Sequence, residues 1–166
     1  RAAQAVSHPG GPSLFSDLVR ELAGVMRSAS AFVAVFSDEA HSELRTLAIQ
    51  IDDEPRDNFV YRVEGTPCSH VVGRAFRYVP QGVAAEFPPG AIFAAKGMDS
   101  YAAYPLNDSG GAPLGLLVAM DREPIADAAL AEALLKIFAG RIVAEIERRR
   151  SDEALHAAAL AVSGAY

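Results

Sequence analysis

Hydrophobic positions at the start of the chain recur with the period of an α-helix. From Ser13, a predicted helix N-cap, apolar residues are spaced three and four apart, which is the spacing of one helical face. This face comprises Phe15, Leu18, Leu22 and Val25, with Leu14, Val19 and Met26 beside it. A second, longer helix is expected from Ile125 to about Leu160. Its apolar side comprises Leu130, Leu134, Ile137, Phe138, Ile142 and Ile146. The folded part is therefore predicted to begin and end with amphipathic helices.

Between these helices the hydrophobic pattern is that of β-strands. The continuous apolar run 31–36 predicts a fully buried strand. The segment 43–51 predicts its neighbour, joined to it by a turn at 38–42. The stretch 52–57 is charged and contains Pro55, so we expect it to be a surface loop.

The next segments are shorter. In 59–63 large apolar residues alternate with smaller or polar ones, which predicts a half-buried strand. The pair Thr66-Pro67 predicts a helix start, because Thr can cap a helix and Pro suits its first position. That helix is expected to end at Gly73. A short strand is expected at 75–79 and a helical turn at 91–96.

A β-hairpin is the clearest local signal in the chain. Two apolar, β-favouring runs, 100–106 and 114–121, flank the cluster Asn-Asp-Ser-Gly-Gly at 107–111. Gly and Asn accept the positive φ that a tight reversal needs, so the cluster predicts the turn.

The order of these features resembles the core of a GAF domain. Its elements are Ser-Tyr-x-x-x-Pro-Leu at 100–106, a Gly-rich turn, Leu-Gly-Leu-Leu at 114–117, an acidic residue, a proline and a long helix. A second match, Tyr-Arg-Val-Glu-Gly-Thr-Pro-Cys at 61–68, resembles the strand-to-helix junction of many bacterial GAF domains. With the flanking helices, the resemblance extends from about Ser13 to Arg150.

This resemblance implies an α+β fold of GAF/PAS-like type. A central antiparallel sheet of five to six strands is expected, with the N- and C-terminal helices packed on one face. The connections on the opposite face are expected to form a ligand pocket. The implied domain occupies 13–150, preceded by a linker at 1–12 and followed by a connector helix at 151–166 towards another module.

Strand alternation assigns residues to the two faces of the sheet. Along 100–106, Tyr101, Ala103 and Pro105 point to one side, and the residues between them point to the other. By resemblance the first set faces the pocket, and Phe87 is among the aromatic residues expected to close it. The expected ligand-pocket residues are Cys68, Phe76, Tyr78, Phe93, Tyr101, Ala103, Val118 and Met120. For each aromatic residue the alternative is that it simply fills the core.

Cys68 is the single cysteine and the candidate for thiol chemistry. Close to a helix start, unpaired amide donors would lower its pKa and raise its reactivity. The alternative is a small, buried, apolar filler, which predicts slow alkylation in the native state. His70, two residues on, is a candidate contact for the thiol or a ligand, or an exposed or capping side chain.

Known chemistries of GAF relatives do not match this sequence. The motifs around bilin-attachment cysteines and the dispersed Asn-Lys…Phe…Asp-Glu signature of cyclic-nucleotide binders are missing. Free methionine sulfoxide reductases use several cysteines, and one cysteine cannot complete an intramolecular thiol–disulfide cycle. The four histidines are widely separated, so no metal site is expected, and we expect no catalytic residues.

Composition limits the number of domains, the kinds of partner and the cellular location that we expect. The chain has 166 residues, of which 51% are hydrophobic, so one globular domain is expected. A formal net charge of −6 without a basic stripe argues against nucleic acid as a partner. A lone cysteine fits a reducing cytoplasm. No apolar run approaches the ~20 residues of a membrane span, so no membrane insertion is expected. The start at Arg1 suggests a piece of a longer protein.

The sequence thus predicts a regulatory, small-molecule-sensing and dimerisation domain of a multidomain bacterial signal-transduction protein. Its expected partners are an unidentified small molecule, an output domain of the same chain, and a second copy in a parallel homodimer through the terminal helices. No cofactor is identified. The alternatives are a ligand-free dimerisation and signal-relay module, or a thiol redox sensor that uses Cys68.

Overall fold

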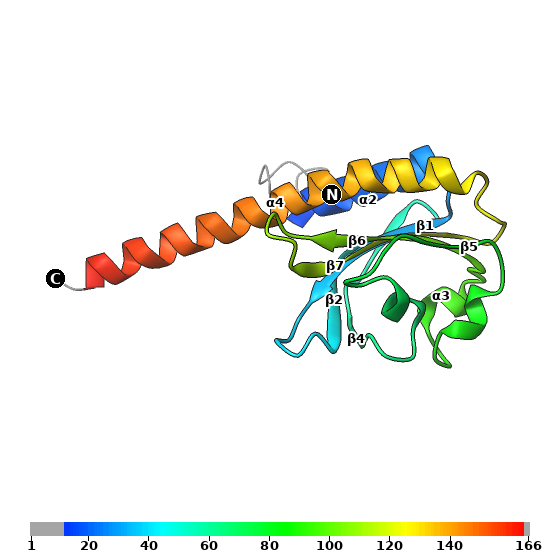
Figure 1. The fold of residues 1–166 in the computed structure, drawn as a ribbon, viewed down its shortest axis with the longest axis horizontal. Helices are drawn as coiled ribbons and strands as arrows, with labels where there is room; N and C mark the ends of the chain where they lie inside the picture. The colour runs from blue at the N-terminus through cyan, green and yellow to red at the C-terminus, as the bar shows by residue number, and fades with distance from the viewer. Residues whose placement is uncertain (1–11, 165–166) are drawn as a thin grey trace.

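Two terminal helices lie side by side on one face of a β-sheet (Figure 1). The structure, a computed structural model, describes residues 12–164. Helix α2 spans Pro12–Met26 and helix α4 spans Ala128–Gly164. The predicted linker 1–12 lies outside the described residues except for Pro12, which begins α2. Ser13 is therefore inside the helix and is not its cap.

The sheet has seven strands, all paired antiparallel. They are β1 (Ser30–Phe36), β2 (Glu43–Ile51), β3 (Glu54–Arg56), β4 (Val60–Arg62), β5 (Arg77–Val79), β6 (Ser100–Asn107) and β7 (Pro113–Asp121). Their order is β3-β2-β1-β7-β6-β5, and β4 also pairs with β2. The predicted α+β architecture is confirmed, with more strands than expected. The extra strand is β3, at the predicted loop 52–57; Pro55 is tolerated there because β3 lies at the sheet edge.

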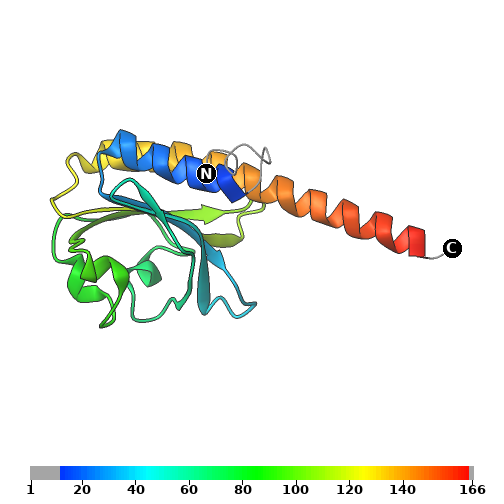
Figure 2. The same ribbon diagram turned by 180° about the vertical axis from the view of Figure 1, so that it is seen from behind.

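The connecting segments cover the opposite face of the sheet (Figure 2). They include the 3₁₀ helices η1 (Pro67–His70) and η2 (Val83–Glu86) and the one-turn helix α3 (Ile92–Ala95). The predicted helix after Thr66 is thus a single 3₁₀ turn. The Thr66 hydroxyl does not cap it, because this hydroxyl donates to the Val63 carbonyl at 2.7 Å.

Side chains on the two sheet faces form two separate cores. Alternation along β6 and β7 sends Ala102, Leu106 and Leu117 to the core under the helices. Tyr101, Ala103 and their β7 neighbours belong to the core on the other side. The predicted division of these strands between two faces is therefore confirmed.

The predicted faces of both helices need correction. Leu130 and Ile137 are 53% and 61% exposed, and Val25 of α2 also faces solvent. The buried side of α4 instead comprises Ala131, Leu135, Phe138, Ala139, Ile142 and Ile146. Apolar residues occur on two sides of α4, and helical periodicity alone does not say which side meets the sheet.

Gly115 of β7 lies directly against the backbone of β1. A Cβ at this position would lie 1.9 Å from the Ala34 carbonyl oxygen and 2.7 Å from Val35 Cα. Both are backbone atoms of the central strand, so the two strands would have to separate. The pairing of β1 with β7 therefore requires glycine here.

We expect Gly115→Ala to lower the free energy of unfolding by at least about 1–3 kcal/mol, the usual cost of overpacking a core. Urea denaturation measures this. The control is Gly140→Ala in α4, where a Cβ meets no atom within 4 Å. It should raise stability by roughly 0.5–1 kcal/mol, because Ala is the better helix former. Equal stabilities of the two variants would contradict the close approach.

Candidate ligand cavity

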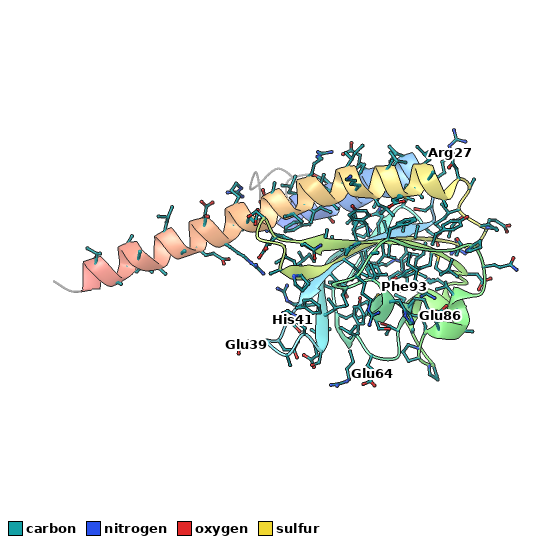
Figure 3. The ribbon with its side chains drawn as sticks, viewed as in Figure 1. Arg27, Glu39, His41, Glu64, Glu86 and Phe93 are labelled. Atoms are coloured by element: carbon teal, nitrogen blue, oxygen red, sulfur yellow. The ribbon has the colours of Figure 1, made fainter. Side chains whose placement is uncertain are left out.

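A cavity of ≈ 270 Å³ lies on the sheet face away from the terminal helices. Figure 3 shows Phe93, one of its walls, on that side of the sheet. The cavity lies between the central sheet and the two segments that cover it, one carrying β4 and η1 and the other carrying α3. Its lining residues are Phe32, Phe59, Tyr61, Thr66, Cys68, Phe87, Pro88, Gly90, Ala91, Ile92 and Phe93.

Aromatic rings make most of the wall. Phe32 projects from β1 and stacks on Phe93 of α3, with ring centroids 4.9 Å apart. Phe87 lies 6.1 Å from Phe93, and Phe59 lies 5.6 Å from Tyr61. Both distances fall within the range of favourable aromatic pairs. The wall is thus assembled from segments that are far apart in the chain.

The connecting segments over this face of the sheet, called the cover below, are attached to the sheet by charged side chains. Arg77 of β5 donates to both carboxylate oxygens of Glu86 in η2, at 2.7 and 3.0 Å. Arg122, after β7, makes two 2.9 Å bonds to Asp52 and donates to the Lys96 carbonyl at the end of α3. The hydrogen bonds from Arg122 lower the pKa of Asp52. These contacts hold the cover in place from outside the cavity.

Two residues of the cavity wall, Cys68 and Tyr61, meet the Tyr101 phenol behind the wall. The Tyr61 hydroxyl lies 3.3 Å from Cys68 Sγ, and the Tyr101 hydroxyl donates to the same sulfur at 3.5 Å. Burial raises the pKa of the Cys68 thiol, outweighing the hydrogen bonds that lower it. Burial likewise raises the pKa of both tyrosines well above the usual value. All three groups therefore stay protonated near neutral pH.

Of the two alternatives for Cys68, the structure fits the buried apolar filler better than a thiol activated by a helix start. Its side chain is only 1% exposed, and η1 is a single 3₁₀ turn with few free amide donors. Desolvation therefore dominates the pKa of the thiol. His70 is exposed. Within residues 12–164 no cluster of three or more His, Cys, Asp or Glu side chains is placed to hold a metal ion.

The structure brings only some of the predicted pocket residues to the cavity. Cys68 and Phe93 line it, as does Phe87. Behind them, buried in the same core but not on the cavity wall, are Tyr101, Ala103, Val118 and Met120.

Phe76 and Tyr78 lie on the wrong side of the sheet for the predicted role. In the pairing of β5 with β6, Tyr78 is opposite Ala102, so its ring takes the helix face. Its hydroxyl donates to the Ile125 carbonyl just before α4. Phe76, two residues earlier, shares that face and packs against the same core. The register of a three-residue edge strand cannot be read from its own sequence.

Sequence reasoning missed much of the wall. The pattern at 59–63 predicts a half-buried strand and gives Phe59 and Tyr61 no role in the pocket. Their alternation was a usable signal, because it placed both large rings on one side. Phe32 and the segment 88–92 carried no such signal, since their position depends on how the cover folds back over the sheet.

No protein-family model matches this sequence, and no curated protein matches it. Solved structures do match the fold. The GAF domain of a phosphoenolpyruvate-protein phosphotransferase from Coxiella burnetii has a TM-score of 0.68 and 17% identity, covering 92% of each chain. The A. Aeolicus nlh2 GAF domain has a TM-score of 0.65 and 12% identity, covering 87% of this chain and 90% of that one.

A third match is the free methionine-R-sulfoxide reductase from Neisseria meningitidis. Its TM-score is 0.67 at 14% identity, covering 90% of this chain and 86% of the reductase. An antiparallel sheet with its terminal helices on one face and a covered cavity on the other belongs to the GAF/PAS-like class of α+β domains. Within that class, this chain has the GAF fold.

We expect Cys68 to alkylate far more slowly in the native chain than in the unfolded chain, because its thiol is buried and its pKa is raised. Mass spectrometry after timed iodoacetamide treatment measures the rate, and the lone cysteine makes the product unambiguous. The control is the same chain in concentrated urea. Native labelling at the unfolded rate would instead favour a thiol sensor.

Proposed function

We propose that this chain is a sensory and regulatory domain that binds a small molecule in the cavity and passes its occupancy to helix α4. The main observation that supports this proposal is the apolar cavity on one face of the sheet, opposite the face that holds the projecting helix. The proposal includes a setting in a multidomain bacterial signalling protein of the cytoplasm. It assigns no catalysis to the chain, because the cavity is lined without a charged side chain or an ionised nucleophile.

The β6–β7 hairpin connects the cavity side of the sheet with α4. Ala103 of β6 pairs with Val118 of β7, and both belong to the core around the cavity. In the turn of this hairpin, the Ser109 amide and hydroxyl both donate to Glu147 of α4 at 2.8 Å. A shift of these strands on ligand binding would therefore act directly on the helix.

A second contact fixes the point where α4 leaves the domain. Glu145 is buried and accepts hydrogen bonds from Arg148, at 3.0 and 2.7 Å, and from Arg149 at 2.7 Å. These bonds lower the pKa of Glu145 to about 2. The Arg149 guanidinium also lies 4.4 Å from the centre of the Phe15 ring in α2. Both terminal helices and the hairpin thus meet within one turn of α4.

Beyond this point α4 continues as an exposed helix. Residues 151–164 are all exposed, and the helix projects past the sheet in both views (Figures 1 and 2). The predicted connector 151–166 is helical through Gly164, and its last two residues lie outside the described part. Among residues 12–164, no helix combines the length and the apolar character that crossing a bilayer requires.

Two pairs of exposed apolar residues form an interrupted stripe on the solvent side of α4. Its exposed members are Leu130, Ile137, Leu155 and Val162. Seven residues make nearly two helical turns, and the 18 residues from Ile137 to Leu155 make five, so all four share one side. An interrupted stripe with members on both the packed and the projecting parts of α4 fits a second copy of α4 in a parallel pair. The homodimer is therefore part of the proposal.

We expect light scattering at tens of micromolar to give twice the 17.5 kDa of one chain. The double variant Ile137→Glu, Leu155→Glu should be a folded monomer, because these side chains are 61% and 70% exposed in one chain. Leu160→Glu is the matched control, since Leu160 is 59% exposed but lies off the stripe. A monomeric wild-type chain would contradict the dimer.

For the sensory role, we expect some compound in a broad panel of charged and neutral metabolites to raise the melting temperature with increasing concentration. Ala91→Trp should abolish the shift, because Ala91 lines the cavity and the indole would fill it. Ala95→Trp is the control, in the exposed part of α3 outside the cavity. Ala103→Trp should instead destabilise the fold by about 1–3 kcal/mol through overpacking.

The outcome separates the proposed sensor from its nearest alternative. A panel in which no compound stabilises the wild-type chain would contradict the sensory role and favour a ligand-free relay. A compound that stabilises Ala91→Trp as strongly as wild type would bind elsewhere than in this cavity.

A further inference from the structure

We infer that the cavity takes an uncharged aromatic molecule of one or two rings, which carries one hydrogen-bond acceptor for the Tyr61 hydroxyl. This inference rests on the proposed sensory function and adds the chemical class of the ligand to it. It follows from the size of the cavity, the uncharged wall and the arrangement of the rings. It also follows from the hydrogen bonds around Cys68, which leave one donor without an acceptor.

The volume limits the ligand to a small molecule. An apolar cavity of about 150 Å³ is enough to hold benzene, and pockets for drug-sized ligands begin at about 300 Å³. At ≈ 270 Å³ this cavity holds one ring with a substituent, or two fused rings.

The charge of the wall excludes an ionised ligand. None of the described residues that line the cavity is charged. The nearby guanidinium of Arg77 is already bound to Glu86 by two hydrogen bonds outside the wall. An ion taken out of water needs a paired charge or several hydrogen bonds, and this wall offers neither. The ligand is therefore neutral.

The rings of the wall favour an aromatic ligand. Phe32 and Phe93 are nearly parallel, with 25° between their planes, while Phe87 and Phe59 are tilted relative to their neighbours. The wall thus holds rings at several different angles to one another. Aromatic pairs prefer offset-stacked and edge-to-face contacts, so a flat ring finds partners of both kinds.

The thiol and the two phenols leave one donor for the ligand. Tyr101, Cys68 and Tyr61 carry three protons but share only two contacts, and Tyr101 uses its proton on the sulfur. The Tyr61–Cys68 contact fits either atom as the donor. With the thiol donating to the Tyr61 oxygen, the Tyr61 O–H is free to donate into the cavity. The Thr66 hydroxyl is already used on Val63. An acceptor on the ligand would satisfy Tyr61, whose raised pKa keeps it protonated.

The test compares three probes that share one benzene ring. Acetophenone is neutral and has a carbonyl acceptor, ethylbenzene is neutral without an acceptor, and benzoate is an anion. Calorimetry and thermal shift on the full 166-residue chain should show that acetophenone binds more tightly than ethylbenzene. Benzoate should give no shift at the same concentrations.

Two variants isolate the hydroxyl. Tyr61→Phe keeps the ring and should weaken acetophenone binding about three- to tenfold, the factor that one neutral hydrogen bond supplies, while ethylbenzene binding is unchanged. Tyr104→Phe is the matched control, because Tyr104 packs on the helix side of the sheet. It should change neither affinity. Melting curves of both variants verify that they are folded.

Each contrary result has its own meaning. Binding of benzoate or another anion in preference to acetophenone would overturn the ligand class and leave the sensory function standing. Equal loss of acetophenone and ethylbenzene binding in Tyr61→Phe would overturn the role of the hydroxyl. A chain that responds to neither these probes nor the metabolite panel would overturn the proposed function itself.

Discussion

The rest of the structure depends on the pairing of the central strand β1 with both β2 and β7. Six of its seven residues are buried, because helices cover one of its faces and the connecting segments cover the other. Ala31 and Val33 belong to the core under α2 and α4, while Phe32 and Ala34 belong to the cavity core. Gly115 leaves the room that the pairing of β7 with this strand requires. The two faces therefore share one backbone, and neither core can shift without the other.

The two cores have different tasks. The helix-side core is filled mainly by aliphatic side chains from strands and helices, together with the rings of Phe15 and Phe138. On the other side, the cover is short, irregular and attached by ion pairs and backbone hydrogen bonds at its edges. The space left between the sheet and the aromatic rings of this cover is the cavity. Packing defects of this kind are where small-molecule sites form.

Burial and its compensation also determine which side chains are ionised. Cys68 has the hydrogen-bonding partners that would activate a thiol, yet the cost of desolvation keeps it protonated. At the helix side, Glu145 is buried as well, but two guanidinium groups keep it ionised. Neutral groups thus face the cavity, and paired charges lie where α4 leaves the domain. This separation suits an apolar ligand on one face and a rigid helical connection on the other.

The sequence by itself determined the elements that depend on near neighbours. The bounds of β2, the β6–β7 hairpin with its Gly-rich turn, and the alternation of Tyr101 and Ala103 all follow from local periods and turn residues. Only the tertiary structure decided which side of α4 meets the sheet, because Leu130 and Leu135 both fit a helical stripe. It also decided the face of Tyr78, through the β5–β6 register, and the cavity wall, through the folding of 87–93 over β1. These features depend on contacts between distant segments, whose free energies no local pattern contains.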